Sequence, residues 1–555
     1  MSMHRCEVAV TEIANCEAQV WETGASASAL ASYRDALPVA GRHEFIVVIP
    51  VADRPEQLRA VLDSLLGQCR DFRYGGMADG QFCKVRALIA DDSASARNVA
   101  ANRNLAEEFS AQGLNTEYFG TDAQHRCLAA LPDRGALDHV LGARAAHPHK
   151  GASVSRNLAY LRLAELATPD RLFFFVDSDE QFKVRIPDGD RGRDVNGISY
   201  FHTLDRIFSR GDVDVLTGKV VGDPPVSPAV MAGNFLDDVL LLLNELSDLA
   251  PSAACTFHGD NARQANDAAY HDMADLFGFK PAEAFRYRCT RNGDHDHRDC
   301  LAGFAAHLDR FFDGEHPTRL SHFEYLGSLD DTTPARTVYT GNYVINTRGL
   351  EHFIPFAPLK LRMAGPVLGR LIKARLGGRF VSANLPLLHT RTAASSGRAE
   401  FRPGVDRVRN EVDLSGEFER QFWGDVMLFT VERLIAEGYP ETDVGRAAIE
   451  AQVDAAMAEL EQRYIDKQRT ILVKLERVQS AFSALTGKGF NDAQTSRRFD
   501  AFIANIARNF GGHEGRPGVA ESSQARRAAI CDALLALNAD RAAWSQSLTA
   551  IRSRA

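Results

Sequence analysis

The feature that most constrains the fold is a short apolar run that ends at two carboxylates. Residues 172–176 (LFFFV) are apolar at every position, which is typical of a parallel strand covered by helices on both faces. Asp177 and Asp179 follow at once, and residues two apart on an extended chain point to the same side. Ligands of open α/β sheets lie beyond the carboxyl ends of the strands. Two acids at this place contribute little to stability, and they predict a site for a divalent cation.

The neighbouring segments predict an alternation of strands and helices. Strands are expected at residues 44–51, 85–90, 116–119 and 172–176, and later at 213–221, 338–346 and 379–388. After the first strand, Pro55 lies in the first turn of a helix, and Asp53 is its predicted cap. Residues 124–149 are predicted to be an insertion or a mobile loop. The series favours an α/β fold with a doubly wound sheet and right-handed crossovers.

Length and composition predict how many regions the chain has and which classes of protein it resembles. A chain of 555 residues is too long for one ordinary core, so we expect an N-terminal extension (1–42), an α/β domain with insertions (43–410) and a helical C-terminal region (411–555). Apolar residues recur at helical spacing within 444–482, which indicates packing or possible homo-oligomerisation through the C-terminal helices. The net charge of −9 argues against nucleic acid as the main partner. Nine cysteines without a disulfide framework, no apolar signal core and no membrane span predict a cytoplasmic protein.

Acidic residues follow several of the predicted strands. Asp91 and Asp92 come directly after the second strand, and Asp177 and Asp179 follow the strand at 172–176. Any one pair could cap a helix or form a turn, but several on one edge of a sheet predict a bound nucleotide with Mg²⁺ or Mn²⁺. His389, after a later strand, is a candidate further ligand, and a purely structural histidine is an equal alternative.

Four segments in order carry a family resemblance. VVIPVADRPEQLRAVLDSLLGQ, LIADDS, GASVSRNLA and FFFVDSDEQF resemble the GT-A fold glycosyltransferases, particularly the family-2-like group. The resemblance covers residues 44–182 well and 338–391 loosely. It implies a GT-A (Rossmann-like, nucleotide-diphospho-sugar transferase) domain and a hexosyltransferase-type enzyme. The implied donor is a UDP- or GDP-linked sugar, the implied cofactor is Mn²⁺ or Mg²⁺, and the acceptor is a saccharide, a lipid-linked glycan or a small hydroxylated molecule.

The resemblance also implies roles for individual residues. Asp91 and Asp92 would hold the nucleoside. Asp177 and Asp179, the Asp-X-Asp element, would bind the metal and the diphosphate, and His389 would complete the metal site. The residues implied to contact the donor are Pro50, Ala52, Asp91, Asp92, Lys150, Arg156, Asp177 and Ser178.

Two departures from the family pattern bear on mechanism. The position after the first strand that is commonly aromatic is Ala52 here, so stacking on the base must come from elsewhere. Many inverting members carry an acidic catalytic base before the helix that leads to the last strand, and residues 361–366 (LRMAGP) contain none. Glu351 and Asp331 are the nearest acids in sequence. A retaining reaction would not need this base, so the stereochemistry stays open.

Two other functions stay open at this stage. A nucleotidyltransferase has a related sheet, but it would open with a glycine-rich loop where this chain has PVADRPEQ. The missing conventional base leaves room for a catalytically silent scaffold that recruits partners through its helical region.

A second group of candidate metal ligands lies in the middle of the chain. Cys289, His295, His297 and Cys300 fall within one polar segment, and thiolates with imidazoles are zinc ligands. Their spacing matches no standard zinc finger, so a solvated polar loop is the alternative. His258, nearby in sequence, could line an acceptor pocket.

Overall fold

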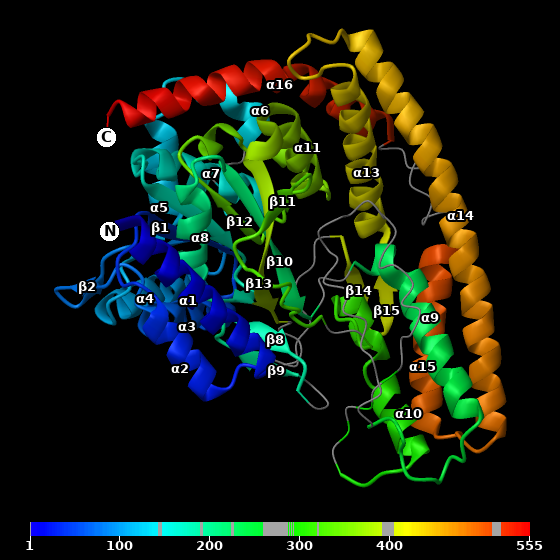
Figure 1. Cartoon of the computed structure of the whole chain (residues 1–555). Coiled ribbons are helices and arrows are strands. Elements are labelled where there is room, and N and C mark those ends of the chain that lie inside the picture. The colour runs from blue at the N-terminus through cyan, green and yellow to red at the C-terminus, as the bar shows by residue number, and fades with distance from the viewer. Residues whose placement is uncertain are drawn as a thin grey trace.

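The computed structural model describes residues 2–142, 147–188, 192–223, 227–258, 287, 289, 291, 293–318, 321–390, 404–512 and 523–554, with side chains from residue 11 onward. It is a mixed α/β structure in which helices cover a large curled sheet (Figure 1). No helix within these residues is both long and apolar enough to cross a membrane.

The sheet is parallel in one half and mixed in the other. Its parallel half consists of β6 (Arg171–Val176), β1 (Glu44–Val51), β4 (Val85–Asp91) and β5 (Thr116–Phe119), in that order. The other half consists of β11 (Thr332–Pro334), β13 (Phe380–His389), β10 (Val215–Gly222) and β12 (Asn342–Ile345), and β12 borders β6. β12 runs antiparallel to both of its neighbours. A strand occurs at each predicted place, but the one predicted at 338–346 covers only Asn342–Ile345, and its reversed direction was not foreseen.

Side chains of the strands alternate between two apolar layers. In β1, Phe45, Val47 and Ile49 face one layer, and Ile46 and Val48 face the other. The first layer contains helices α1 (Ser2–Glu22), α2 (Ala27–Ala36), α3 (Pro55–Phe72), α4 (Ala96–Ala111) and α8 (Tyr200–Ser209). The second contains α7 (Ala152–Glu165), α9 (Pro228–Ser247), α11 (Ala364–Leu376) and the C-terminal helices (Figure 1).

The interpretation of residues 124–149 as an insertion or a mobile loop was wrong where the chain is helical, which is about half of this length. The chain there forms α5 (Thr121–Ala129), a short 3-10 helix η1 (Gly135–Leu137) and α6 (Asp138–Leu141), while residues 143–146 lie outside the described part. Leu128, Leu137 and Val140 are buried and join the second apolar layer. Leu137, Val140 and Leu141 have helical spacing, but Pro132 and Gly135 interrupt the pattern, so each helical run is short.

The C-terminal helices share their core with the α/β region. α13 (Ser415–Ala436), α14 (Arg446–Gly487), α15 (Ala493–Gly511) and α16 (Ser523–Arg552) contribute to the same apolar cluster as α7 and α11. α14 packs along α9, and α16 crosses α7 (Figure 1). Most of the apolar positions predicted on α14 are therefore buried within the chain itself.

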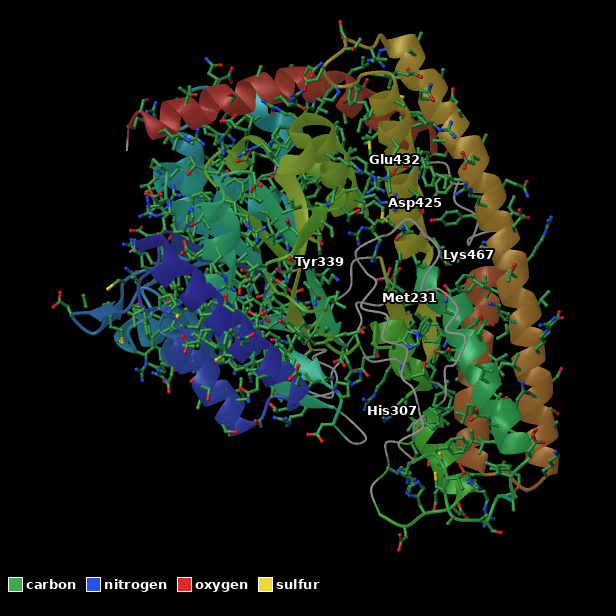
Figure 2. All side chains as sticks on the ribbon, in the orientation of Figure 1. Met231, His307, Tyr339, Asp425, Glu432 and Lys467 are labelled. Carbon is green, nitrogen blue, oxygen red and sulfur yellow. The ribbon has the colours of Figure 1, made fainter. Side chains whose placement is uncertain are left out.

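A buried polar group links three of these helices (Figure 2). The Tyr464 hydroxyl of α14 donates to Asp425 Oδ2 of α13 at 2.6 Å. Lys467 Nζ of α14 donates to the Val230 carbonyl of α9 at 2.8 Å. Burial raises the pKa of Asp425 to about 7 and lowers the pKa of Lys467 to about 7. Buried polar groups are stable only when their hydrogen bonds are made, and these bonds restrict how the three helices can pack against one another.

The remaining short elements lie outside the main sheet, apart from β7. They are β2 (Met77–Ala78), β3 (Gln81–Phe82), β7 (Glu180–Gln181), β8 (Val184–Ile186), β9 (Arg193–Val195), β14 (Asp406–Val408), β15 (Glu411–Asp413), α10 (His297–Ala305) and the 3-10 turns η2 (Leu308–Asp313), η3 (Gly349–Glu351), η4 (Ala357–Leu359) and η5 (Gly377–Arg379). β7 pairs with the end of β13 and so extends the sheet at the edge discussed below.

His202 of α8 is predicted to make the fold sensitive to acid. Its Nε2 donates to the Pro38 carbonyl at 2.7 Å, and its Nδ1 accepts from the Ser199 hydroxyl at 2.6 Å. Burial lowers the pKa of His202 from 6.5 to about 4, because the buried site disfavours the imidazolium ion. Neutral His202 therefore stabilises the fold at a pH above 6.5, its pKa in the unfolded chain. As the pH falls from there to about 4, its pKa in the folded protein, the free energy of unfolding should fall by about 3 kcal/mol.

Urea unfolding at a series of pH values checks this expectation. Between about pH 7 and pH 4 the free energy of unfolding should fall less steeply in His202→Gln than in the wild type. The matched control is His147→Gln, at an exposed position, which should keep the wild-type slope. Equal slopes for His202→Gln and the wild type would show that protonation of His202 is not coupled to unfolding.

Candidate functional site

The predicted acidic residues meet at one edge of the sheet. In the parallel register Val51 of β1 lies beside Asp91 of β4, and β6 ends one residue before Asp177. Because β12 is antiparallel to β6, its first residue, Asn342, pairs with Val176 at this same edge. β13 ends here too, since His389 pairs with Glu180 of β7. We call this edge the acidic rim.

Asp177 is held from two sides. Its backbone N–H donates to the Gly341 carbonyl at 3.2 Å, and its carboxylate forms an ion pair with the Arg156 guanidinium of α7. The Arg156 side chain is 4% exposed, whereas that of Asp177 is 35% exposed. The guanidinium thus supports the carboxylate from inside the protein, and the carboxylate faces the surface.

Asp179 lies between a histidine and an arginine. Its Oδ2 is 3.6 Å from His389 Nε2 and 3.3 Å from Arg54 Nη1. The Asp179 carbonyl accepts a hydrogen bond from the Thr390 backbone N–H at 3.0 Å, which joins the Asp-X-Asp segment to the end of β13. His389 Nδ1 is 2.5 Å from the Asp223 carbonyl. A carbonyl can only accept, so Nδ1 carries a proton, and in the neutral ring Nε2 presents its lone pair on the side of Asp179.

Glu180 is a third carboxylate in the group. It is fully buried, and burial followed by the negative charges of Asp177 and Asp179 raises the pKa of its carboxyl well above the ordinary value. Its Oε1 atom makes no hydrogen bond to any described residue. A Cβ on Gly341 would come within 2.6 Å of Glu180 Oε1 and 3.0 Å of Asp177 Oδ2, so the glycine is what lets these carboxylates approach β12.

These residues fit a divalent cation. Carboxylate oxygens suit Mg²⁺ and Mn²⁺, and imidazole nitrogen is an accepted ligand of several transition metals. A histidine that binds a metal usually donates its other ring N–H to a carbonyl or a carboxylate, and His389 does so to Asp223. A cation at the acidic rim would also offset the negative charge of the aspartates that meet there.

Asp91 and Asp92 are buried and already have partners within the chain. Asp91 accepts hydrogen bonds from the Ser93 backbone N–H (2.8 Å), Asn102 Nδ2 (3.1 Å) and the Tyr118 hydroxyl (2.8 Å). Asp92 forms an ion pair with Lys150, with its Oδ1 2.7 Å from Nζ. Their carboxylates hold the loops after β4 and before α7 in place, so Lys150 is committed to Asp92.

The other predicted donor-binding positions differ in exposure. Pro50 is buried within β1 beside Ala90 of β4, and Ser178 is 6% exposed between the two aspartates. Ala52 is exposed directly after β1. Of these three positions, only Ala52 presents its surface to solvent.

Asp53 does not cap the helix that begins at Pro55, so that prediction was wrong. Asp53 adopts a positive φ of 56°, and its carboxylate accepts from the backbone N–H groups of Ala94 and Ser95, both at 3.1 Å. Burial alone would raise the pKa of Asp53, but the hydrogen bond with His149 (2.6 Å) and those at the start of α4 lower it. Asp53 therefore ties the loop after β1 to the loop after β4.

Like Glu180, Arg54 is a residue of the acidic rim that sequence reasoning missed. It precedes α3, its side chain is 30% exposed, and it contacts Asp179. The signal was present in the sequence, because an arginine follows the first strand directly before a proline that begins the helix. Its importance depends on β1 and β6 being neighbours, which one segment alone does not reveal.

The two candidate catalytic acids do not lie at the acidic rim. Glu351 belongs to η3, beyond the opposite end of β12, and its Oε1 is 3.4 Å from Arg552 Nη1 of α16. It lines a small pocket of about 40 Å³ on that side of the molecule, together with Pro440 and Arg541. Asp331 precedes β11, which pairs with the first half of β13, far along the strand from His389.

Comparison with known proteins finds similarity among solved structures but none at the level of families. No family model matches the chain, and no curated protein matches it. Among solved structures it is similar to the mannosyltransferase PcManGT from Pyrobaculum calidifontis in complex with GDP-Man and Mn²⁺. The superposition covers 90% of this chain and 97% of that chain, with a TM-score of 0.31 and 11% identity. A likeness this loose establishes neither fold nor activity, so the function is argued from the chain's own residues.

Proposed function

We propose that this protein is a metal-dependent glycosyltransferase of the GT-A type, which moves a sugar from a nucleoside diphosphate sugar to a hydroxyl-bearing acceptor. The observation that carries the proposal is the pairing of Asp179 with His389. Two strands far apart in sequence bring a carboxylate and an imidazole within 3.6 Å, with the imidazole already oriented by the Asp223 carbonyl. This is the arrangement expected of metal ligands rather than of a cap or a turn.

Several residues at the acidic rim have a part in this proposal. Asp177, Asp179 and His389 would hold Mn²⁺ or Mg²⁺, and Arg156 fixes the Asp177 carboxylate from behind. When bound, the ion neutralises negative charge on the diphosphate leaving group. Arg54, beside Asp179 and partly exposed, is placed to donate hydrogen bonds to phosphate oxygens.

In this proposal, Asp91 and Asp92 act on nucleoside binding indirectly, by holding the surrounding loops in position. Both carboxylates are buried and bonded within the chain, so they shape the loops that would contact the base and ribose. Neither Glu351 nor Asp331 is proposed as the base that removes the proton of the acceptor hydroxyl, because both lie away from the acidic rim.

Calorimetric titration with UDP, GDP and their sugars, with and without Mn²⁺, tests the proposal. We expect one nucleoside diphosphate to bind in a Mn²⁺-dependent way and its sugar conjugate to be hydrolysed slowly when no acceptor is present. Binding without hydrolysis or transfer would favour a silent scaffold. Release of pyrophosphate from a nucleoside triphosphate would favour a nucleotidyltransferase.

Gly341→Ala should impair the site while leaving the fold in place. The new Cβ would lie 2.6 Å from Glu180 Oε1 and 3.0 Å from Asp177 Oδ2, so these carboxylates must move. Because small displacements of positioned groups cost about 100-fold in rate, we expect turnover to fall by that order. The control is Gly378→Ala, where a Cβ would meet nothing within 4 Å. Unchanged Mn²⁺ affinity and turnover in Gly341→Ala would contradict the assigned arrangement of Asp177.

A further inference from the structure

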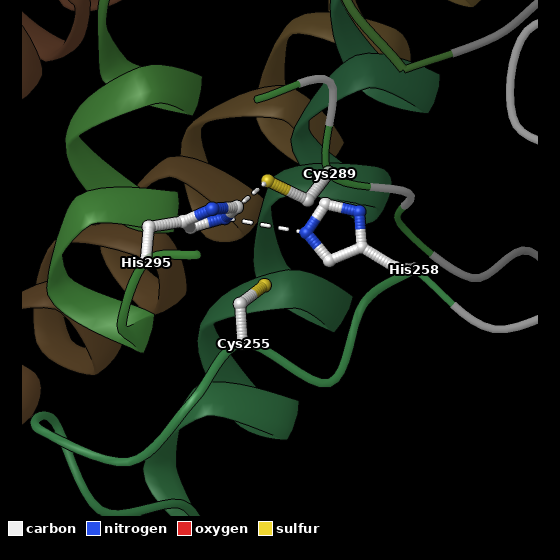
Figure 3. Close-up of side chains that lie close together, drawn as sticks. All are labelled: Cys255, His258, Cys289 and His295. Atoms are coloured by element: carbon white, nitrogen blue, oxygen red, sulfur yellow. Dashed lines mark hydrogen bonds between the residues drawn. The ribbon is translucent and has the colours of Figure 1, made fainter. Parts of the chain in front are cut away.

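Four metal-binding side chains converge at a place far from the acidic rim. They come from two segments on either side of residues 259–286, which the structure does not describe. One segment follows α9 and the other precedes α10, as Figure 3 shows. The ligand atoms all lie within 4.8 Å of one another, and the residues are Cys255, His258, Cys289 and His295.

Three of these ligand atoms have spacings close to those of tetrahedral zinc coordination. His258 Nε2 and His295 Nε2 are 3.3 Å apart, and Cys289 Sγ is 3.2 Å from His295 Nε2. Two nitrogens that each bind a tetrahedral zinc ion at its usual bond length are separated by about 3.3 Å, and a sulfur and a nitrogen by about 3.6 Å. The two imidazoles and the thiol thus already stand close to the spacing that an ion between them requires.

The imidazole of His295 is oriented by a backbone carbonyl on the side away from the cluster. His295 Nδ1 is 2.7 Å from the Gly293 carbonyl, so Nδ1 carries the proton and Nε2 presents its lone pair to the cluster. Cys289 is buried, and its Sγ lies 3.2 Å from His295 Nε2, so the thiol and the imidazole face the same point. The thiolate is the form that binds a metal.

We propose that Cys255, His258, Cys289 and His295 form a structural zinc site. Four protein ligands close the coordination sphere and leave no open position for substrate, which is the pattern of structural rather than catalytic zinc. Two thiolates also balance the charge of the ion. This set keeps two of the four residues singled out in the sequence and replaces the other two.

The two residues replaced have other roles. His297 Nδ1 is 2.9 Å from the Ala250 carbonyl, and its Nε2 contacts the Thr256 hydroxyl at 3.2 Å, so both ring nitrogens face partners other than the cluster. Cys300 is buried in α10, and its sulfur is not among the ligand atoms that all lie within 4.8 Å of one another, so it is not assigned as a ligand.

The proposed ion would join two segments of the chain that are separated in sequence by residues 259–286. The segments already meet through backbone hydrogen bonds from Cys255 N–H to the His295 carbonyl (2.9 Å) and from Cys289 N–H to the Phe257 carbonyl (3.0 Å). A metal that bridges both segments closes this loop, and closing a loop removes conformational freedom from the unfolded chain. The ion would thereby fix α10 against the end of α9.

The test is the metal content of the full-length protein, purified without chelators and then reconstituted with zinc. We expect about one tightly bound zinc per chain in the wild type, lost in Cys255→Ser and in His295→Asn. Cys300→Ser and Cys83→Ser, the latter at an exposed cysteine outside the cluster, should each retain it. Circular dichroism of each variant shows whether loss of zinc accompanies loss of the fold.

Cobalt substitution of the wild type gives a readout that does not depend on any variant. Tetrahedral Co²⁺ bound by two thiolates should show intense visible bands and a sulfur-to-metal charge-transfer band, and zinc should displace both. Failure of the wild type to retain zinc, retention by Cys255→Ser or His295→Asn, loss in Cys300→Ser, or a disulfide among Cys255, Cys289 and Cys300 would each overturn the assignment.

Discussion

Asp179→Ala should lower metal-dependent turnover of the sugar donor by about 10³-fold or more, because it removes a direct ligand of the ion that stabilises the leaving group. The fold should be nearly unaffected. Asp179 lies between β6 and β7, and the Arg54 side chain that it contacts is 30% exposed, so water can solvate the guanidinium once the carboxylate is gone. Turnover is measured with a radiolabelled or coupled donor assay at saturating Mn²⁺.

Asp170→Ala is the matched control for this prediction. Asp170 lies at the opposite end of the same strand, is exposed and pairs with Arg42. The control should keep wild-type turnover. Wild-type activity in Asp179→Ala would remove the metal assignment, and equal losses in both variants would point to a general effect on the strand.

Asp92→Ala should destabilise the protein by about 3–5 kcal/mol, because it leaves a buried ammonium without its counter-charge. The side chains of Asp92 and Lys150 are 6% and 2% exposed. Asp92 also accepts hydrogen bonds from the backbone N–H groups of Lys150 (3.2 Å) and Gly151 (3.1 Å) at the start of α7. Replacing the carboxylate thus removes the support for the helix that carries Arg156.

A double variant without charges separates the ion pair from the packing. Asp92→Leu with Lys150→Met replaces both charges by apolar groups, and it should recover much of the stability lost in Asp92→Ala. The free energy of unfolding in urea is the measure. A loss below about 1 kcal/mol in Asp92→Ala, or a double variant no more stable than the single one, would show that the pair is not what holds this loop.

The elements that could be predicted from the sequence are those whose signal is local. The strands β1, β4, β5 and β6 are dense apolar or β-branched runs, and each lies within a residue or two of its predicted position. The rule that parallel strands end at one edge then placed Asp91 and Asp177 on the acidic rim. β12 was found as a strand, but its antiparallel direction depends on the path of the chain between strands.

What could not be predicted depends on contacts between distant segments. The spacing of apolar residues predicted the helix α14. It did not predict that α14 packs along α9 in a core shared with the α/β region. Arg54 and Asp179 are 125 residues apart and meet only because β1 and β6 are neighbours. Cys255 and Cys289 converge across a long intervening stretch, so a search within one segment found only half of the cluster.

Pulsed electron paramagnetic resonance of Mn²⁺ bound to the zinc-loaded protein, in the presence of the nucleoside diphosphate, tests the central claim most directly. Mn²⁺ should show a coupling to one imidazole nitrogen and to phosphorus. The nitrogen coupling should vanish in His389→Asn, while His202→Gln, which alters a buried histidine outside the acidic rim, leaves it unchanged. If Mn²⁺ does not bind with the diphosphate, or if the nitrogen coupling survives in His389→Asn, the ion is not held by Asp177, Asp179 and His389.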